Sequence, residues 1–288
     1  MDRIKKIDQE KKNIIANYEE NWDKMMTEWN KDDNTDSFWL TFSACYLFKT
    51  GKVRWALDPV SLLHRMDAGR DESELIYKHK RNFVEDFKKL SFVLLSHYHV
   101  DHYDFRIIDS LSSLPIKVVV SEQLFPIILK DTEMPKEKLI ILKNNESINI
   151  CGIKITAFDG FHDNGMIQVP SNSYLIDSGK CRMFFSGDVR EYNKDALPPI
   201  SLIDFYFAHL WLGGKSALLK EYELLKPFCE FSSKLNPKKI FITHLFEVAR
   251  IAEDYWNNYH SEKVENYLME HYPEINVETP QLNHRVIL

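Results

Sequence analysis

The segment Ser96-His97-Tyr98-His99-Val100-Asp101-His102 carries the strongest chemical signal in the sequence. It directly follows the apolar run Phe92–Leu95, so a strand is expected to end where the histidines begin. In an extended chain, residues i and i+2 project to the same side, and His97 and His99 can therefore hold one ion together. The aspartate and last histidine of the segment lie in the turn that follows and can serve a second ion. Imidazole and carboxylate suit zinc, manganese or iron, so the segment predicts a metal site at a strand end.

Length and composition limit the class of protein. The chain has 288 residues and a mass of 34.1 kDa, which suits one large or two small domains. Aromatic residues make up 13%, too many for a disordered chain. The formal net charge of −6 does not suit a protein that follows a long nucleic-acid backbone. No apolar run approaches the roughly 20 residues that span a bilayer, so we expect no membrane span.

The cysteines and the start of the chain predict a location. Four cysteines lie far apart without a CxxC pair, which favours neither a disulfide framework nor a zinc finger: Cys45, Cys151, Cys181 and Cys229. The residues after Met1 are charged and contain no apolar core of a signal peptide. Together these features favour the reducing cytoplasm.

Residues 2–30 predict an amphipathic helix, because apolar side chains recur at three- and four-residue steps between Lys and Glu. The polar residues 31–36 predict a linker. This helix could pack on the body of the protein, cover a site as a lid, or bind a second copy in a homo-oligomer.

From Ser37 onward, strand patterns alternate with helical ones, which predicts an α/β fold. Strands are expected at 38–48, 53–57, 92–95, 118–120, 148–157, 173–176, 183–185, 205–208 and 240–243, and helices at about 73–89, 104–112, 122–130, 215–234 and 250–270. The hairpin signals Thr50-Gly51-Lys52 and Ser178-Gly179-Lys180 are each followed by an apolar strand and then an aspartate, Asp58 and Asp188. This repetition predicts two related β-rich halves, with two sheets inside two helical layers.

The histidine segment resembles the HxHxDH signature of the metallo-β-lactamase superfamily, and the rest of the chain is similar to that family in order. Four further segments match its pattern: Leu57-Asp58-Pro59, Phe161-His162-Asp163, Ser186-Gly187-Asp188 and Thr243-His244-Leu245. The resemblance covers residues 37–288 and implies a metallo-β-lactamase-fold hydrolase domain there, a four-layer αββα sandwich. The amphipathic helix and linker expected over residues 1–36 lie outside it, as an extra N-terminal helix.

The same resemblance implies a site for two divalent metal ions, zinc foremost, with manganese or iron as alternatives. One ion is expected on His97, His99 and His162. The second is expected on Asp101, His102 and His244, with Asp188 bridging the two. Asp58 is expected outside the ligand set, where it accepts the N–H of a ligand histidine and fixes its tautomer.

Such a site implies hydrolysis. Two cations lower the pKa of a bridging water toward about 7 and produce hydroxide, while Asp101 orients the nucleophile or accepts its proton. The chain looks most like the branch that contains L-ascorbate-6-phosphate lactonase and N-acyl-phosphatidylethanolamine phospholipase D. We expect a small-molecule substrate, either an anionic lactone or ester. The alternative is a phosphodiester in a cyclic nucleotide, short nucleic acid or phospholipid headgroup. A non-catalytic scaffold is disfavoured because every expected ligand type is present.

Four further residues are candidates near this site. Tyr192 could contact a substrate carbonyl, and Arg190 could bind a phosphate or carboxylate or form a surface salt bridge. His209 could protonate a leaving group or simply pack beside aromatic residues. Lys215, after two glycines, could bind an anion at a helix start. The remaining histidines lie among polar residues and are expected at the surface: His64, His79, His260, His271 and His284.

Overall fold

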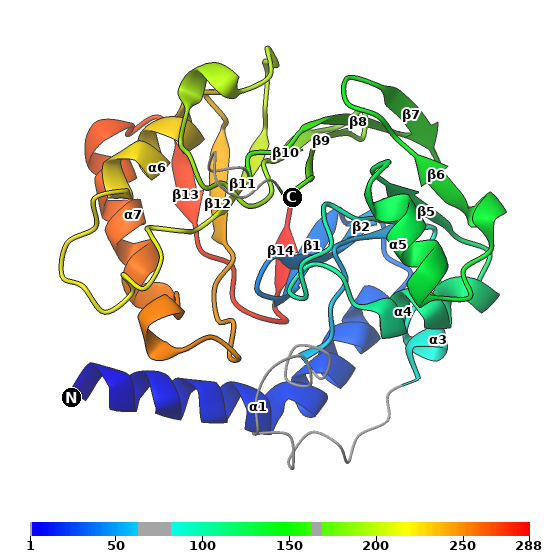
Figure 1. The fold of residues 1–288 in the computed structure, drawn as a ribbon, viewed down its shortest axis with the longest axis horizontal. Coiled ribbons are helices and arrows are strands. Elements are labelled where there is room, and N and C mark those ends of the chain that lie inside the picture. The colour runs from blue at the N-terminus through cyan, green and yellow to red at the C-terminus, as the bar shows by residue number, and fades with distance from the viewer. Residues whose placement is uncertain (1, 63–81, 163–168) are drawn as a thin grey trace. The chain divides into compact units, whose positions relative to one another are not determined.

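The structure is a computed structural model that describes residues 2–62, 82–162 and 169–288. The chain divides into two compact units. The first comprises Met1–Ile15 and Asn144–Pro280, and the second Ala16–Lys143 and Gln281–Leu288. Each unit contains one seven-stranded sheet with helices beside it (Figure 1). The expected domain division after residue 36 stays a prediction.

The sheet of the second unit has the strand order β14-β1-β2-β3-β4-β5-β6. Its strands from β14 to β3 pair antiparallel, and those from β3 to β6 pair parallel. The strands are β1 (Ser37–Phe42), β2 (Cys45–Thr50), β3 (Val53–Leu57), β4 (Phe92–Leu94), β5 (Lys117–Val120), β6 (Leu139–Ile141) and β14 (Arg285–Ile287). The described helices of this unit beyond α1 are α3 (Phe83–Asp86), α4 (Phe105–Ser110) and α5 (Leu124–Asp131).

The sheet of the first unit has the order β13-β12-β11-β10-β9-β8-β7 and is also mixed. Its strands pair antiparallel from β7 to β10 and parallel from β10 to β13. They are β7 (Ser147–Ile150), β8 (Ile153–Asp159), β9 (Asn172–Asp177), β10 (Arg182–Phe185), β11 (Phe205–His209), β12 (Lys239–Thr243) and β13 (Asn276–Glu278). Helices α6 (Leu225–Ser233) and α7 (Asn258–His271) lie beside this sheet (Figure 1).

Both sheets change from antiparallel to parallel pairing at the same place in their order. The first hairpin signal joins β2 to β3, and the second joins β9 to β10. Strands β3 and β10 then pair parallel with the next strand of the chain. The predicted α/β fold with two related β-rich halves is therefore confirmed.

Some expected elements differ in their bounds. The expected strand 38–48 is two strands, because Ser43 has a left-handed φ of 47°. The expected strand 148–157 is likewise a hairpin that turns at Cys151 and Gly152, where φ is 53° and 83°. The helix expected from 215 begins only at Leu225, and the helix expected from 250 begins at Asn258. Most of the helix expected at 73–89 lies outside the described residues.

Helix α1 spans Asp2–Trp29, as the periodicity predicts. Within the second unit, its last turns pack on the sheet and α3: the rings of Trp22 and Trp29 meet Phe87, and Trp29 Nε1 donates to Phe48 O at 3.1 Å. Arg54 donates to the carbonyl of Trp29 at 2.8 Å, so a cation lies at the carbonyl end of the helix, where the helix dipole favours positive charge. No helix of the described chain is long and apolar enough to cross a membrane.

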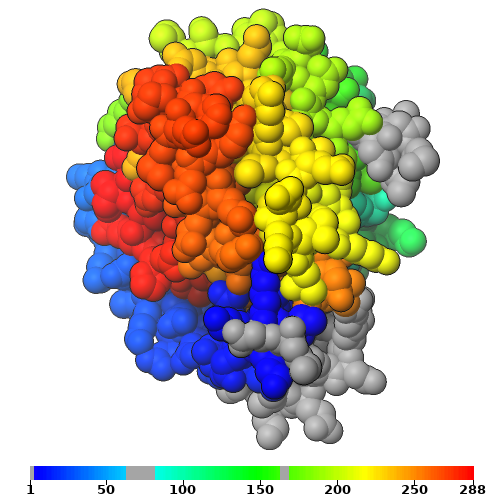
Figure 2. Space-filling view, turned by 90° about the vertical axis from the view of Figure 1, so that its left-hand side faces the viewer, coloured from blue at the N-terminus to red at the C-terminus, as the bar shows by residue number. Residues whose placement is uncertain are grey.

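Within the first unit, the start of α1 is held by a buried histidine. Arg3 donates to Leu219 O and Tyr222 Oη, and its Nη2 lies 2.9 Å from His260 Nε2. In Figure 2 the start of the chain, in dark blue, lies directly against the yellow segment, which contains Leu219 and Tyr222. His260 is fully buried, so the expectation that it lies at the surface is wrong. It closes the N-terminus of α7 in a capping box with Asn257, which the polar sequence around it does not reveal.

The remaining histidines expected at the surface have different outcomes. His271 and His284 are exposed, as expected. His64 and His79 lie outside the described residues.

Burial of His260 predicts a pH-dependent stability. Burial lowers the pKa of His260 to about 4, and the charges of Arg3 and Lys263 add to this effect. The unfolded chain therefore binds the proton more readily, and the stabilisation present above pH 6.5 is lost as the pH falls toward 4. Urea denaturation at pH 7 and at pH 4.5 measures how far the free energy of unfolding falls between these two pH values. We expect this fall to be smaller in His260→Gln than in the unaltered protein. His271→Gln is the matched control and should follow the unaltered protein; equal pH dependence in all three would contradict the assignment.

Candidate metal centre

The histidine segment alternates as an extended chain requires. His97 and Asp101 are buried and His99 is half-buried, whereas Tyr98 and Val100 between them are 45% and 39% exposed. His97 Nε2 lies 3.2 Å from His99 Nδ1, and the rings of His97 and His102 are 4.2 Å apart. The second unit therefore gathers three imidazoles at the end of β4, on the segment that also carries the buried Asp101.

Asp58 holds this loop from the neighbouring strand. Because β3 and β4 pair parallel, the residues that follow them lie at the same sheet edge. The Asp58 carboxylate accepts the backbone N–H of Ser96 at 2.7 Å and the Ser96 hydroxyl, and it lies 2.8 Å from His102 Nδ1. A proton on Nδ1 directs the other ring nitrogen, Nε2, toward a ligand, which is the arrangement typical of metal-binding histidines.

Asp104 is a second buried aspartate beside this loop, and it is not among the residues expected from the sequence. Its Oδ1 accepts the backbone N–H groups of Arg106 and Ile107, so it caps α4, and its Oδ2 accepts both donors of Ser61. Asp104 therefore fixes where the histidine loop ends. An aspartate immediately before a helical pattern is the sequence signal that identifies such a cap.

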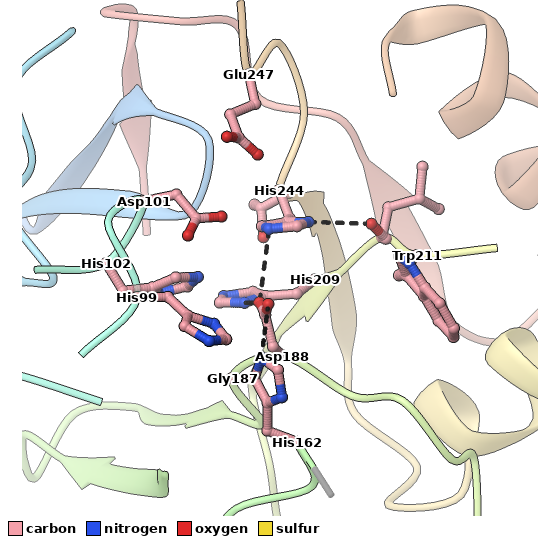
Figure 3. Close-up of polar contacts among 12 residues, drawn as sticks. His99, Asp101, His102, His162, Gly187, Asp188, His209, Trp211, His244 and Glu247 are labelled. Atoms are coloured by element: carbon pink, nitrogen blue, oxygen red, sulfur yellow. Dashed lines mark hydrogen bonds and ion pairs between the residues drawn. The ribbon is translucent and has the colours of Figure 1, made fainter. Parts of the chain in front are cut away.

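The first unit gathers three histidines around Asp188 (Figure 3). His209 Nδ1 lies 3.1 Å and His244 Nε2 3.6 Å from Asp188 Oδ1, and His162 Nε2 lies 3.6 Å from Oδ2. All four side chains are buried. His244 Nδ1 lies 3.2 Å from Leu210 O, a position from which it can donate and leave Nε2 facing Asp188.

The pairing of the strands explains this gathering. Strands β8, β10, β11 and β12 all run in the same direction, so the residues that follow them meet at one sheet edge. Gly187, with φ of 67°, turns the chain after β10, and His244 itself adopts a left-handed φ of 64°. After β8, a Cβ on Gly160 would lie 2.0 Å from Ser171 Oγ, so only glycine lets the chain pass toward His162.

Arg190 lies beside this cluster and lines a cavity of about 180 Å³. Its Nη2 is 3.2 Å from Asp188 Oδ2, and its guanidinium lies 4.8 Å from the centre of the Trp211 ring. The lining residues are Arg190, Trp211, Gly214, His244, Glu247, Arg250, Asp254 and Trp256. Glu247 and Arg250 are not among the residues expected from the sequence, although both closely follow His244 at the end of its strand.

Tyr192 and Lys215 make contacts within the first unit. Burial raises the pKa of Tyr192 well above its usual value, its hydroxyl donates to Trp211 O at 2.5 Å, and its ring packs on two phenylalanines of α6. These contacts favour packing over a contact with substrate. The expectation that Lys215 begins a helix is wrong: it lies in a turn with φ of 54°, and its backbone N–H donates to Asp254.

The comparison with known families decides the classification. The model of the beta-lactamase superfamily domain matches residues 66–211, just over half of the chain. The chain belongs to the beta-lactamase superfamily. No curated protein sequence matches it significantly. Membership and fold together confirm the expected metal-dependent hydrolase of the metallo-β-lactamase fold.

Solved structures of this superfamily fold are similar over most of the chain. A putative metal-dependent hydrolase from Parabacteroides distasonis is 16% identical with a TM-score of 0.58, covering 86% of this chain and 93% of that one. An isothiocyanate hydrolase from Delia radicum gut bacteria is 14% identical with a TM-score of 0.60, at 88% and 98% coverage. CmlA, a diiron beta-hydroxylase from Streptomyces venezuelae, is 14% identical with a TM-score of 0.61, and the match covers 89% of this chain and 55% of CmlA.

The side chains present fit the divalent metals that this superfamily fold implies. Nitrogen and oxygen donors dominate both clusters, as zinc, manganese and iron prefer. Burying several histidines and aspartates together costs free energy unless they are paired or coordinate a cation. In each cluster an acceptor beside one histidine, Asp58 for His102 and Leu210 O for His244, leaves Nε2 as the donor atom for a metal.

Proposed function

We propose that the chain is a dinuclear metal-dependent hydrolase. The observation that carries the proposal is that the buried imidazoles in both units lie at the ends of parallel strands and are held by buried carboxylates, Asp58 and Asp188. His97, His99 and His162 are proposed to hold one metal ion. Asp101, His102 and His244 are proposed to hold the second, with Asp188 shared by both.

In this proposal the side chains around the metals position the reacting groups. When bound, two divalent cations lower the pKa of a shared water toward about 7 and make it a nucleophile for hydrolysis. Asp101 would orient the attacking water and take up its proton. His209 donates through Nδ1 to Asp188 and would hold this carboxylate in place; with a second proton on Nε2, its imidazolium would donate that proton to the leaving group.

The proposed substrate is a small anionic lactone or ester, as in the branch that contains L-ascorbate-6-phosphate lactonase. The cavity beside His244 supports a small substrate, because about 180 Å³ holds roughly six water molecules. Arg190 in its lining supports an anionic group, since Arg250 is paired with Glu247. The same arginine favours the second candidate function, hydrolysis of a phosphodiester in a cyclic nucleotide, short nucleic acid or lipid headgroup.

Zinc is the proposed metal, with manganese or iron as alternatives. The similarity to a diiron enzyme supports keeping iron among them. The proposed location is the cytoplasm, which fits the four free thiols. Self-association through α1 would have to use its outer face, because most of its large apolar side chains are buried within the chain, including Ile7, Tyr18, Trp22, Met25 and Trp29.

A mixed panel of substrates tests the proposed function. The metal-loaded protein is assayed against lactones, carboxylic esters and phosphodiesters, with His99→Ala as the blank. We expect turnover of lactones or esters that His99→Ala lacks. Turnover confined to phosphodiesters would replace the leading proposal by the second. Two bound metals without turnover of any of these substrates would contradict both.

A further inference from the structure

The guanidinium of Arg190 has donors that the described chain does not use. An arginine presents five N–H donors. In the described residues, the side chain of Arg190 donates only through Nη2, to Asp188, and its guanidinium carbon lies 4.8 Å from the centre of the Trp211 ring. Its side chain is 17% exposed, and it lines the cavity beside His244. Nε, Nη1 and the second hydrogen of Nη2 have no acceptor among the described residues, so Arg190 has donors left for a ligand.

The other charges of the cavity have partners within the first unit. Glu247, 4% exposed, accepts from Arg250 Nε at 2.5 Å. Asp254 accepts the backbone N–H of Lys215 at 2.5 Å. The ion pair with Arg250 offsets the charge of Glu247, and since Arg250 is engaged there, Arg190 is the cation left to bind an anion.

The walls of the cavity select the rest of the ligand. Two tryptophans, Trp211 and Trp256, are among the residues that line the cavity. Flat apolar groups pack well against indole rings. A volume of about 180 Å³ admits one small ring with a charged substituent, but it is below the roughly 300 Å³ of pockets that enclose a whole drug-sized ligand.

We propose that this cavity is the specificity pocket of the enzyme and that it binds a compact oxyanion, carboxylate or phosphate, attached to a small flat apolar group. Arg190 binds the oxyanion through the second hydrogen of Nη2 together with a neighbouring N–H of the guanidinium, and Asp188 and Trp211 hold the group in position. The bond to be hydrolysed then lies toward His244. This inference rests on the proposed function and narrows its substrate to aryl or similarly flat acids.

Binding of simple acids to the metal-loaded, full-length protein tests the pocket. Benzoate, phenyl phosphate and the neutral benzamide are titrated by calorimetry, and binding to the pocket is followed by quenching of fluorescence that Trp211→Phe removes. We expect one or both acids to bind and benzamide to bind at least about tenfold more weakly. Arg190→Gln should raise the dissociation constant of the bound acid at least about tenfold. Preference for benzoate or for phenyl phosphate identifies the oxyanion.

Arg182→Gln is the matched control, because Arg182 lies in the same unit at the start of β10 and outside the cavity. It should leave acid binding unchanged. The metal content of each variant is measured, and Arg190→Lys, which keeps the charge but loses the fork, replaces Arg190→Gln if that variant loses metal. Equal binding of benzamide and benzoate, or unchanged affinity in the Arg190 variant, would overturn the proposal.

The two proposals fail in different ways. If acids bind in a way that depends on Arg190 but no ester is hydrolysed, the proposed pocket stands and the proposed function is wrong. If neutral and anionic esters are hydrolysed with equal kcat/KM and Arg190→Gln does not change it, the proposed hydrolase stands and the proposed pocket is wrong.

Discussion

Asp188→Ala is expected to lower kcat/KM by about a thousandfold, or about 4 kcal/mol of transition-state stabilisation. Asp188 is the carboxylate that His162, His209 and His244 all approach within 3.6 Å. Without it, the proposed metals lose their shared ligand, and His209 loses its acceptor. Steady-state kinetics together with metal analysis of the purified variant measure the effect.

Asp177→Ala is the matched control for this experiment. Asp177 ends β9 in the same unit, beside the start of β10, whereas Asp188 follows the end of β10. Its removal should leave turnover and metal content unchanged. An Asp188→Ala protein that retains both metals and full turnover would show that this cluster is not the reactive site.

Asp58→Asn is expected to weaken metal affinity by about 10- to 100-fold while the fold persists. Asparagine tolerates the left-handed φ of 48° at this position, so the backbone can remain as it is. The substitution removes the negative charge beside His102 Nδ1, and with it the preference for a proton on that nitrogen. Competition with a chromophoric chelator measures the change in zinc affinity.

Asp104→Asn provides the comparison, since Asp104 is equally buried and bonds, in the described part of the chain, to Ser61 and the start of α4. It should lower the free energy of unfolding without a comparable loss of zinc affinity. If Asp58→Asn binds zinc as tightly as the unaltered protein, Asp58 does not orient a ligand histidine.

The local motifs were predictable from sequence because their geometry follows from neighbouring residues. Alternation places His97 and His99 on one side of an extended segment, and the two Gly-Lys hairpin signals mark equivalent turns of the two sheets. The family resemblance implies that Asp58 contacts a ligand histidine. The contact with His102 requires parallel pairing of β3 with β4, and the spacing of the residues alone does not predict that pairing.

Other features depend on tertiary contacts that no local pattern reports. His209 reaches Asp188 because β10 and β11 are parallel neighbours. His260 is buried because Arg3, more than 250 residues earlier in the chain, lies against it. The sequence predicts a helix start at Lys215, but the chain turns there because the backbone N–H of Lys215 donates to Asp254, which is distant in sequence.

The central claim is that the chain binds two metal ions through these histidines and aspartates, and metal stoichiometry tests it most directly. Protein purified without chelator and reconstituted with zinc should contain two metal ions per chain by elemental analysis, and Asp188→Ala should contain fewer. A chain that binds no metal after reconstitution, or one whose metal content is unchanged in Asp188→Ala and His99→Ala, would contradict the account.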